Sequence, residues 1–172
     1  MFIDFVGAFS NLPRKFALDI LKEKGALDED GLMILKFLYQ NTVVQFGSKK
    51  VKLTKGAPMG FLSSPAVFGI ALEKLLEMLD KEGIICLLYC DDLVVVGTRS
   101  DILLAQKILN EFSFLSKFEV SGPKSGIVKL ARLSKKKDGH PLWKEYFEWK
   151  PLPWLESYKY LGTLVTRADN LD

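Results

Sequence analysis

The sequence predicts an α+β fold in which an antiparallel sheet carries its helices on one face. Helix-like and strand-like segments mix without the regular alternation of a parallel sheet, and several strand pairs are separated only by short hairpin turns. With 172 residues, of which 48% are hydrophobic and 12% aromatic, the chain is large enough to bury a core. We expect one domain over residues 1–172.

The first third of the chain is expected to hold a strand, two helices and a hairpin. Residues 1–6 form a short apolar strand that Asp4 interrupts. Pro13 suits the first turn of a helix that ends at Gly25, and Asp28 is a candidate N-cap of a second helix. That second helix has an apolar face of Leu32, Leu35, Leu38 and Tyr39. Residues 43–53 then predict two strands about a Gly-Ser-Lys-Lys turn.

Two further helices flank the most apolar hairpin. Ser64 and Pro65 are expected to begin a helix that Gly83 ends, and Ser100 to cap another over 101–112. The first of these helices has a core-facing stripe of Phe68, Ala71, Leu72, Leu75, Leu76 and Leu79. Between them, residues 84–97 predict a strand, a tight turn and a strand. Later strands are expected at 117–120, 126–133, 142–149 and 158–165.

Composition excludes several classes of protein. Two cysteines, Cys86 and Cys90, and a single histidine, His140, provide neither a disulfide framework nor a zinc site. We expect buried, reduced thiols and an intracellular protein, with nucleus or cytoplasm left open. No apolar stretch is long enough to cross a bilayer, and Asp4 interrupts the segment where a signal peptide would need an apolar core. We therefore expect no membrane partner.

Positive charge is concentrated in two stretches, although the formal net charge is only +3. Residues 47–60 contain four lysines and no acid, and residues 121–137 contain six lysines and arginines and no acid. These stretches are either solvated loops or surfaces that face phosphates, and charge alone favours loops.

Asp91 and Asp92 lie inside the apolar run LLYCDDLVVV. Ionised carboxylates are costly among leucine and valine unless a cation meets them. A hairpin tip would push them out of the sheet at a place where they could share Mg²⁺, which prefers hard oxygen ligands. Asp4, the isolated acid of the first strand, is the candidate third ligand. The competing interpretation is a pair of exposed turn residues with Asp4 capping something locally, and the two aspartates alone favour it.

Five blocks, in order along the chain, resemble the motifs of reverse transcriptases. Tyr89-Cys90-Asp91-Asp92 resembles the Tyr-x-Asp-Asp signature, and DFVGAFSNLP resembles the first palm motif, with Asp4 followed five residues later by Phe9. The other three blocks are APMGFLSSPAVF (Pro58, Gly60, Ser64, Pro65, Phe68), GPKSGIV (Lys124) and the primer-grip-like YKYLGTLV (Tyr160, Leu161, Gly162). The pattern is most similar to non-LTR retrotransposon and group II intron enzymes.

The resemblance implies a polymerase palm and assigns roles to its residues. Asp4 and Asp91, supported by Asp92, would hold two Mg²⁺ ions, or Mn²⁺ in their place, and Lys124 would assist the departing pyrophosphate. Phe9 would act as a steric gate against ribonucleotides, although plain core packing also explains it. The remaining contacts to nucleotide, template or primer would come from Met59, Gly60, Tyr89, Tyr160, Leu161 and Gly162.

The partners implied are an RNA template, a DNA primer and a dNTP. The chain departs from the family pattern at Met59, where many relatives have Gln, and at Ser10, where the non-LTR class often has Asp. We expect a palm fragment whose fingers and thumb regions belong to a longer protein, so that the isolated chain has little or no activity. Two alternatives stay open: a degenerate or repurposed palm that binds RNA without catalysis, and an RNA-templated RNA polymerase.

Overall fold

A three-stranded antiparallel sheet lies at the centre of the structure, a computed structural model that describes residues 1–58, 60–128, 130 and 152–166. Its strands, in spatial order, are β1 (Phe2–Ile3), β5 (Asp92–Val96) and β4 (Ile85–Tyr89). The hairpin predicted over 84–97 supplies β4 and β5. The N-terminal strand β1 pairs with β5, with Phe2 opposite Val94 and Ile3 opposite Leu93.

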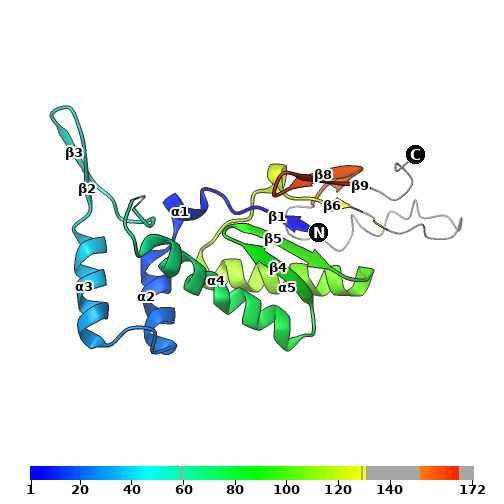
Figure 1. The fold of residues 1–172 in the computed structure, drawn as a ribbon, viewed down its shortest axis with the longest axis horizontal. Coiled ribbons are helices and arrows are strands. Elements are labelled where there is room, and N and C mark those ends of the chain that lie inside the picture. Colours follow the sequence, from blue (N-terminus) through cyan, green and yellow to red (C-terminus); the bar gives the residue numbers. More distant parts are fainter. Residues whose placement is uncertain (59, 129, 131–151, 167–172) are drawn as a thin grey trace, which may run out of the picture.

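Two long helices cover one face of this sheet. They are α4 (Ser64–Lys81) and α5 (Arg99–Ser116), which pack against β4 and β5 (Figure 1). Because side chains alternate along a strand, Ile3, Leu93 and Val95 all point toward the helices and are buried. They join the helical core residues Leu72, Leu75, Leu79, Ala105, Leu109 and Phe112. The predicted α+β class, with helices on one face of an antiparallel sheet, is confirmed.

The opposite face of the sheet is covered only in part, by a second hairpin. This hairpin consists of β8 (Ser157–Tyr160) and β9 (Thr163–Thr166), as predicted for 158–165. The Phe2 ring stacks on Tyr158 with ring centroids 4.3 Å apart. A small apolar cluster forms here from Phe2, Val94, Val128, Leu155, Tyr158, Tyr160 and Val165. Nearby, β6 (Ile127–Val128) pairs in parallel with β7 (Trp154–Leu155), a strand that the sequence did not predict.

The remaining helices extend from the sheet toward the other end of the molecule (Figure 1). They are α1 (Ala8–Asn11), α2 (Arg14–Glu23) and α3 (Glu29–Gln40), and the hairpin of β2 (Val43–Phe46) and β3 (Lys49–Lys52) projects beyond α3. Asp28 caps α3 as predicted and accepts the N–H of Gly31 at 2.8 Å. Within the described residues, no helix is both long and apolar enough to span a membrane.

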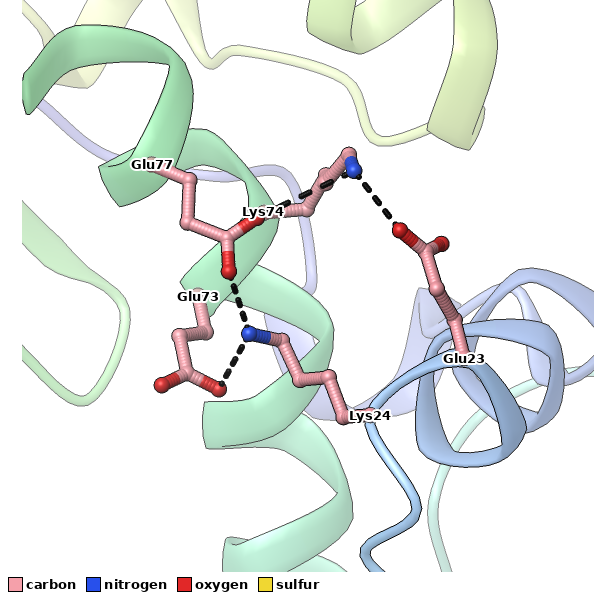
Figure 2. A network of polar contacts seen from close by, with 5 residues as sticks. All are labelled: Glu23, Lys24, Glu73, Lys74 and Glu77. Carbon is pink, nitrogen blue, oxygen red and sulfur yellow. Dashed lines mark hydrogen bonds and ion pairs between the residues drawn. The ribbon is translucent and has the colours of Figure 1, made fainter. Parts of the chain in front are cut away.

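A network of ion pairs joins the end of α2 to α4 (Figure 2). Lys24 pairs with Glu77 and, at 3.1 Å, with Glu73, while Lys74 pairs with Glu23 at 3.0 Å. Charges near the surface are screened by water and salt, so such pairs orient the two helices more than they stabilise them.

Several local predictions were wrong. Thr98, rather than Ser100, caps α5, because Asp101 three residues later completes a capping box with it. The N-cap position of α4 is occupied by Ser63, and Ser64, which we expected there, is the first residue of the helix. The β2–β3 turn is only Gly47–Ser48, so Lys49 and Lys50 belong to a strand.

Burial also differs from expectation at three side chains. Leu38 is 41% exposed and not part of the buried face of α3. Cys90 is exposed and Cys86 half-buried, so the thiols are not the buried pair that we expected. The predicted strand 142–149 lies outside the described residues.

Candidate active site

The two neighbouring acids of the β4–β5 hairpin, Asp91 and Asp92, lie at different positions in it. Tyr89 pairs directly with Asp92, so the turn consists of Cys90 and Asp91 alone. Cys90 has a positive φ of 53°, a conformation that two-residue turns need and that glycine usually supplies. Asp91 therefore lies at the tip, whereas Asp92 begins β5. Tyr89, 61% exposed, lies beside Asp92 at the end of β4.

The sheet register brings Asp4 to Asp92. Since Phe2 faces Val94 and Ile3 faces Leu93, one further step along both strands sets Asp4 across from Asp92. Alternation puts both acids on the face of Phe2 and Val94, which α4 and α5 leave uncovered. Acids from opposite halves of the described chain thus share one end of the sheet.

The segment after α5 holds Asp4 from the other side. The Ser121 N–H donates to the Asp4 carbonyl oxygen at 2.7 Å, and the Asp4 N–H donates to Ser125 Oγ at 3.0 Å. Between these serines, in a 3₁₀ turn over Gly122–Lys124, Lys124 places its Nζ 3.8 Å from Asp4 Oδ2. The structure therefore brings Lys124 to Asp4. Ser125, only 1% exposed, was missed by the sequence analysis, and its position next to Lys124 was its one signal.

The acids influence one another electrostatically. Burial raises the pKa of Asp4, Lys124 offsets part of that rise, and Asp91 adds to it. Burial also raises the pKa of Asp92, where Asp91 and Asp4 raise it further and Lys124 lowers it. Like-charged groups that share one site shift each other's pKa in this way.

The donor atoms fit a divalent cation, although they are not arranged as a finished metal centre. Asp4 Oδ2 is buried and has no hydrogen-bond partner in the described part of the chain. Carboxylate oxygens are the ligands that Mg²⁺ prefers. Within the described ranges, however, no three histidine, cysteine, aspartate or glutamate side chains are grouped closely enough to hold an ion. The metal assignment to Asp4, Asp91 and Asp92 stays a prediction.

Phe9 lies on the short helix α1, next to both the core and a loop. Its ring stacks on Phe68 of α4 with centroids 4.4 Å apart, and it is partly buried, whereas Phe68 is 1% exposed. The Phe9 carbonyl oxygen accepts the N–H of Ala57 at 2.7 Å. Both interpretations of Phe9, steric gate and core residue, fit a ring that is stacked on the core and partly exposed.

The loop before α4 depends on two glycines. Gly56 has a φ of 85°, and a Cβ there would collide with the carbonyl oxygen of Ser10. Gly60 has a φ of 96°, but a Cβ would meet no atom of the described chain within 4 Å. Glycine is therefore favoured at position 60 by its backbone conformation and not by a lack of space. Ser64 Oγ donates to the Pro58 carbonyl at 2.7 Å and ties the loop to α4. Met59 lies outside the described residues.

Arg14 holds this loop and the β2–β3 hairpin together. The side chain is buried, and its guanidinium donates to the carbonyl oxygens of Gly56 at 2.7 Å, Leu53 at 2.6 Å and Tyr39. Its charge also lies over the Tyr39 ring, 5.3 Å from the centroid. Burial lowers the pKa of Arg14, and Tyr39 raises it. This contact was not predicted from the sequence, because an arginine in the first turn of a helix gives no sign of burial.

The β8–β9 hairpin joins the site through two tyrosines. The Tyr160 O–H donates to the Asp92 carbonyl at 3.5 Å, and the Tyr158 O–H donates to the Lys124 carbonyl at 2.9 Å. Leu161 and Gly162 form the turn with φ values of 46° and 85°, the type I′ pattern. Tyr158 was missed, although its two-residue spacing from Tyr160 places both on one face.

Comparison with known proteins identifies the class of protein. The family described as reverse transcriptase (RNA-dependent DNA polymerase) matches residues 1–165. The chain therefore belongs to the reverse transcriptase family, as its motifs predicted.

One similar protein comes from a retrotransposon. The putative 115 kDa protein in type-1 retrotransposable element R1DM of Drosophila melanogaster is 34% identical to the chain over 99 residues. The match covers 55% of the chain and 9% of the length of that relative. The predicted similarity to retrotransposon enzymes is confirmed.

Proposed function

We propose that the chain carries the nucleotidyl transfer site of an RNA-directed DNA polymerase from a retroelement. The 3′-hydroxyl of a DNA primer would attack the α-phosphate of a dNTP paired with an RNA template, and pyrophosphate would leave. The observation that carries the proposal is the register that sets Asp4 across from Asp92, beside Asp91, on the face of the sheet that α4 and α5 leave uncovered. Membership of the reverse transcriptase family supports the reaction class.

The three acids would hold two Mg²⁺ ions, or Mn²⁺ in their place. Two such ions, when bound, stabilise the attacking and leaving oxygens of an in-line phosphoryl displacement. Asp4 contributes a buried oxygen that has no hydrogen-bond partner in the described residues, and Ser125 fixes its backbone. Asp92 is held by the strand pairing of β5, and Asp91 is presented by the turn.

Lys124 would act on the leaving group. Its ammonium lies near Asp4, and its side chain is 73% exposed, so it can meet a phosphate that enters from solvent. A preorganised cation stabilises the negative charge that develops on departing pyrophosphate.

The remaining residues would orient the substrates. Phe9 would occupy the space of a ribose 2′-hydroxyl and so favour deoxynucleotides. Gly60 would let the backbone approach the nucleotide, with Met59 beside it, and Tyr89 would lie next to the reacting end of the primer. The β8–β9 turn, with Tyr160, Leu161 and Gly162, would support the primer strand, and Tyr160 is already bonded to Asp92.

Primer extension by the complete natural protein tests the proposal. We expect Asp91→Asn to abolish dNTP incorporation, whereas Asp80→Asn, an exposed acid at the end of α4, leaves it unchanged. Phe9→Ala should admit ribonucleotides. Incorporation at the wild-type rate by Asp91→Asn would remove the metal assignment.

A second function is favoured by one observation, the departure of Met59 from the glutamine that many relatives have. A repurposed palm would bind RNA without synthesis. RNA binding without any incorporation by the wild-type protein, in Mg²⁺ or in Mn²⁺, would support this alternative.

A further inference from the structure

Two segments that lie far apart in the sequence are in backbone contact next to α4. They are residues 9–14, from α1 to the start of α2, and residues 53–58, in the loop before α4. The Ala57 N–H donates to the Phe9 carbonyl at 2.7 Å. Gly56 lies so close to the first segment that an added Cβ would be 2.4 Å from a backbone oxygen. The position of one segment therefore determines the position of the other.

Arg14 lies at one end of this contact and bonds the loop through its side chain. Its Nε donates to the Gly56 carbonyl at 2.7 Å, and its Nη1 donates to the Leu53 carbonyl at 2.6 Å. Another bond, to the Tyr39 carbonyl, joins the same guanidinium to the end of α3. Because the side chain is buried and its donors are charged, these hydrogen bonds are stronger than neutral ones in water. Arg14 therefore fixes where the loop runs relative to residues 9–14.

Phe9 lies at the other end of the same contact. Its carbonyl oxygen accepts the Ala57 N–H, and its ring stacks on Phe68 of α4 with centroids 4.4 Å apart. The loop continues from Ala57 to Gly60, the residue that would approach the nucleotide in the proposed function. A shift of the loop would therefore change the position of Phe9 relative to Gly60. Arg14 limits such a shift, although its buried side chain is not placed to touch a nucleotide itself.

We propose that Arg14 sets the selectivity between deoxyribonucleotides and ribonucleotides, by holding the loop before α4 in place against Phe9. The inference rests on the proposed function, in which the Phe9 ring occupies the space of a ribose 2′-hydroxyl. A steric gate discriminates by one oxygen atom, so a small displacement of the ring opens it. Arg14 is a positioning residue, because it acts through the loop and not on the substrate.

The test is single-nucleotide primer extension by the complete natural protein, which gives kcat/KM for a dNTP and for the matching rNTP. The ratio of the two values does not depend on the fraction of folded enzyme, because unfolded protein incorporates neither nucleotide. We expect Arg14→Lys to lower the ratio about 10- to 100-fold, since a misplacement of about 1 Å can change a rate about 100-fold. Lysine keeps the charge but cannot reproduce the planar fork that bonds the loop. A wild-type ratio would overturn the proposal.

Two comparisons separate this effect from a general loss of stability. Leu109→Ala removes a fully buried side chain of α5 and changes neither segment of the contact, so it should destabilise the protein but keep the wild-type ratio. In a Phe9→Ala background, Arg14→Lys should lower the ratio no further, because the gate is already absent. An equal reduction by Leu109→Ala, or a further reduction without the Phe9 ring, would contradict the proposal.

Hydrogen exchange without metal or nucleotide tests the positioning separately from synthesis. The Ala57 amide, which bonds the Phe9 carbonyl, should exchange faster relative to the amides of α5 in Arg14→Lys, but not in Leu109→Ala. Unchanged exchange at Ala57 in Arg14→Lys would overturn the proposal whether or not the protein synthesises DNA. If the wild type incorporated no nucleotide, the proposed function would fail and the selectivity role with it. Normal synthesis with an unchanged ratio in Arg14→Lys would overturn the role of Arg14 alone.

Discussion

Replacing Arg14 by methionine tests how the hairpin and the loop before α4 are held. Arg14 is 8% exposed, and its guanidinium donates to the carbonyl oxygens of Tyr39, Leu53 and Gly56. Each hydrogen bond from a charged donor contributes roughly 1.5–3 kcal/mol. Methionine also removes the cost of burying a charge, so we expect a net loss of about 3–5 kcal/mol. That is a large part of the ~5–15 kcal/mol that stabilises a typical domain.

Urea unfolding followed by circular dichroism measures this loss. Arg14→Lys should lose less than Arg14→Met, because it keeps the charge, but one ammonium cannot replace a planar fork that bonds three carbonyls. Hydrogen exchange should accelerate at the amides of Gly56 and Ala57, which bond Leu12 and Phe9, more than in α5. A methionine variant within about 1 kcal/mol of wild type, the range of surface substitutions, would refute the reasoning.

Three further predictions concern Asp4, Gly56 and Thr98. The raised pKa of Asp4 means that the metal-free folded state binds this proton more tightly than the unfolded state, so its contribution to stability falls as pH rises from about 4 through the raised pKa. Asp4→Asn should therefore raise the free energy of unfolding of the metal-free protein more at pH 7 than at pH 4, as measured by denaturant unfolding. If the variant and the wild type had the same dependence of this free energy on pH, the prediction would be wrong. Gly56→Ala should lose more than about 2 kcal/mol, because its φ is positive and its Cβ would collide with Ser10, whereas Gly69→Ala in α4, with open space around the Cβ, should be neutral or stabilising. Thr98→Ala should cost about 1 kcal/mol through loss of the helix cap, and Ser100→Ala much less; equal thermal shifts in the two variants would count against the observed cap.

Elements with strong local signals were predicted well from the sequence. Asp28 before α3, the apolar stripe of α4 and the hairpin around Leu161 and Gly162 each depend on residues within a few positions of one another. The convergence of Asp4 with Asp92 is long-range, and it was anticipated because both interrupt apolar strands and because the motif order resembles one family.

Contacts that depend on tertiary packing were missed. Arg14 bonds carbonyl groups 25 to 42 positions away in the sequence, and Ser125 accepts a hydrogen bond from Asp4, 121 positions away. Neither side chain interrupts a periodic pattern, so nothing local marks it as buried. Tyr158 differs from these two residues, because its spacing from Tyr160 is a local signal, but the resemblance that points to this hairpin rests on Tyr160, Leu161 and Gly162.

The two-residue repeat of β1 links the chemistry of the site to the packing of the core. A slip of this strand by one position against β5 would turn Ile3 toward solvent and drive Asp4 among the leucines of α4 and α5. Exposing Ile3 and burying Asp4 both cost free energy, so the packing of the core disfavours the misaligned strand even without a bound substrate. Single-residue insertions or deletions between Phe2 and Asp4 should consequently destroy the fold and the acid cluster together. A core substitution at Ile3 that loosens the pairing of β1 with β5 would also displace the carboxylate of Asp4, although the Ile3 side chain lies on the other face of the sheet.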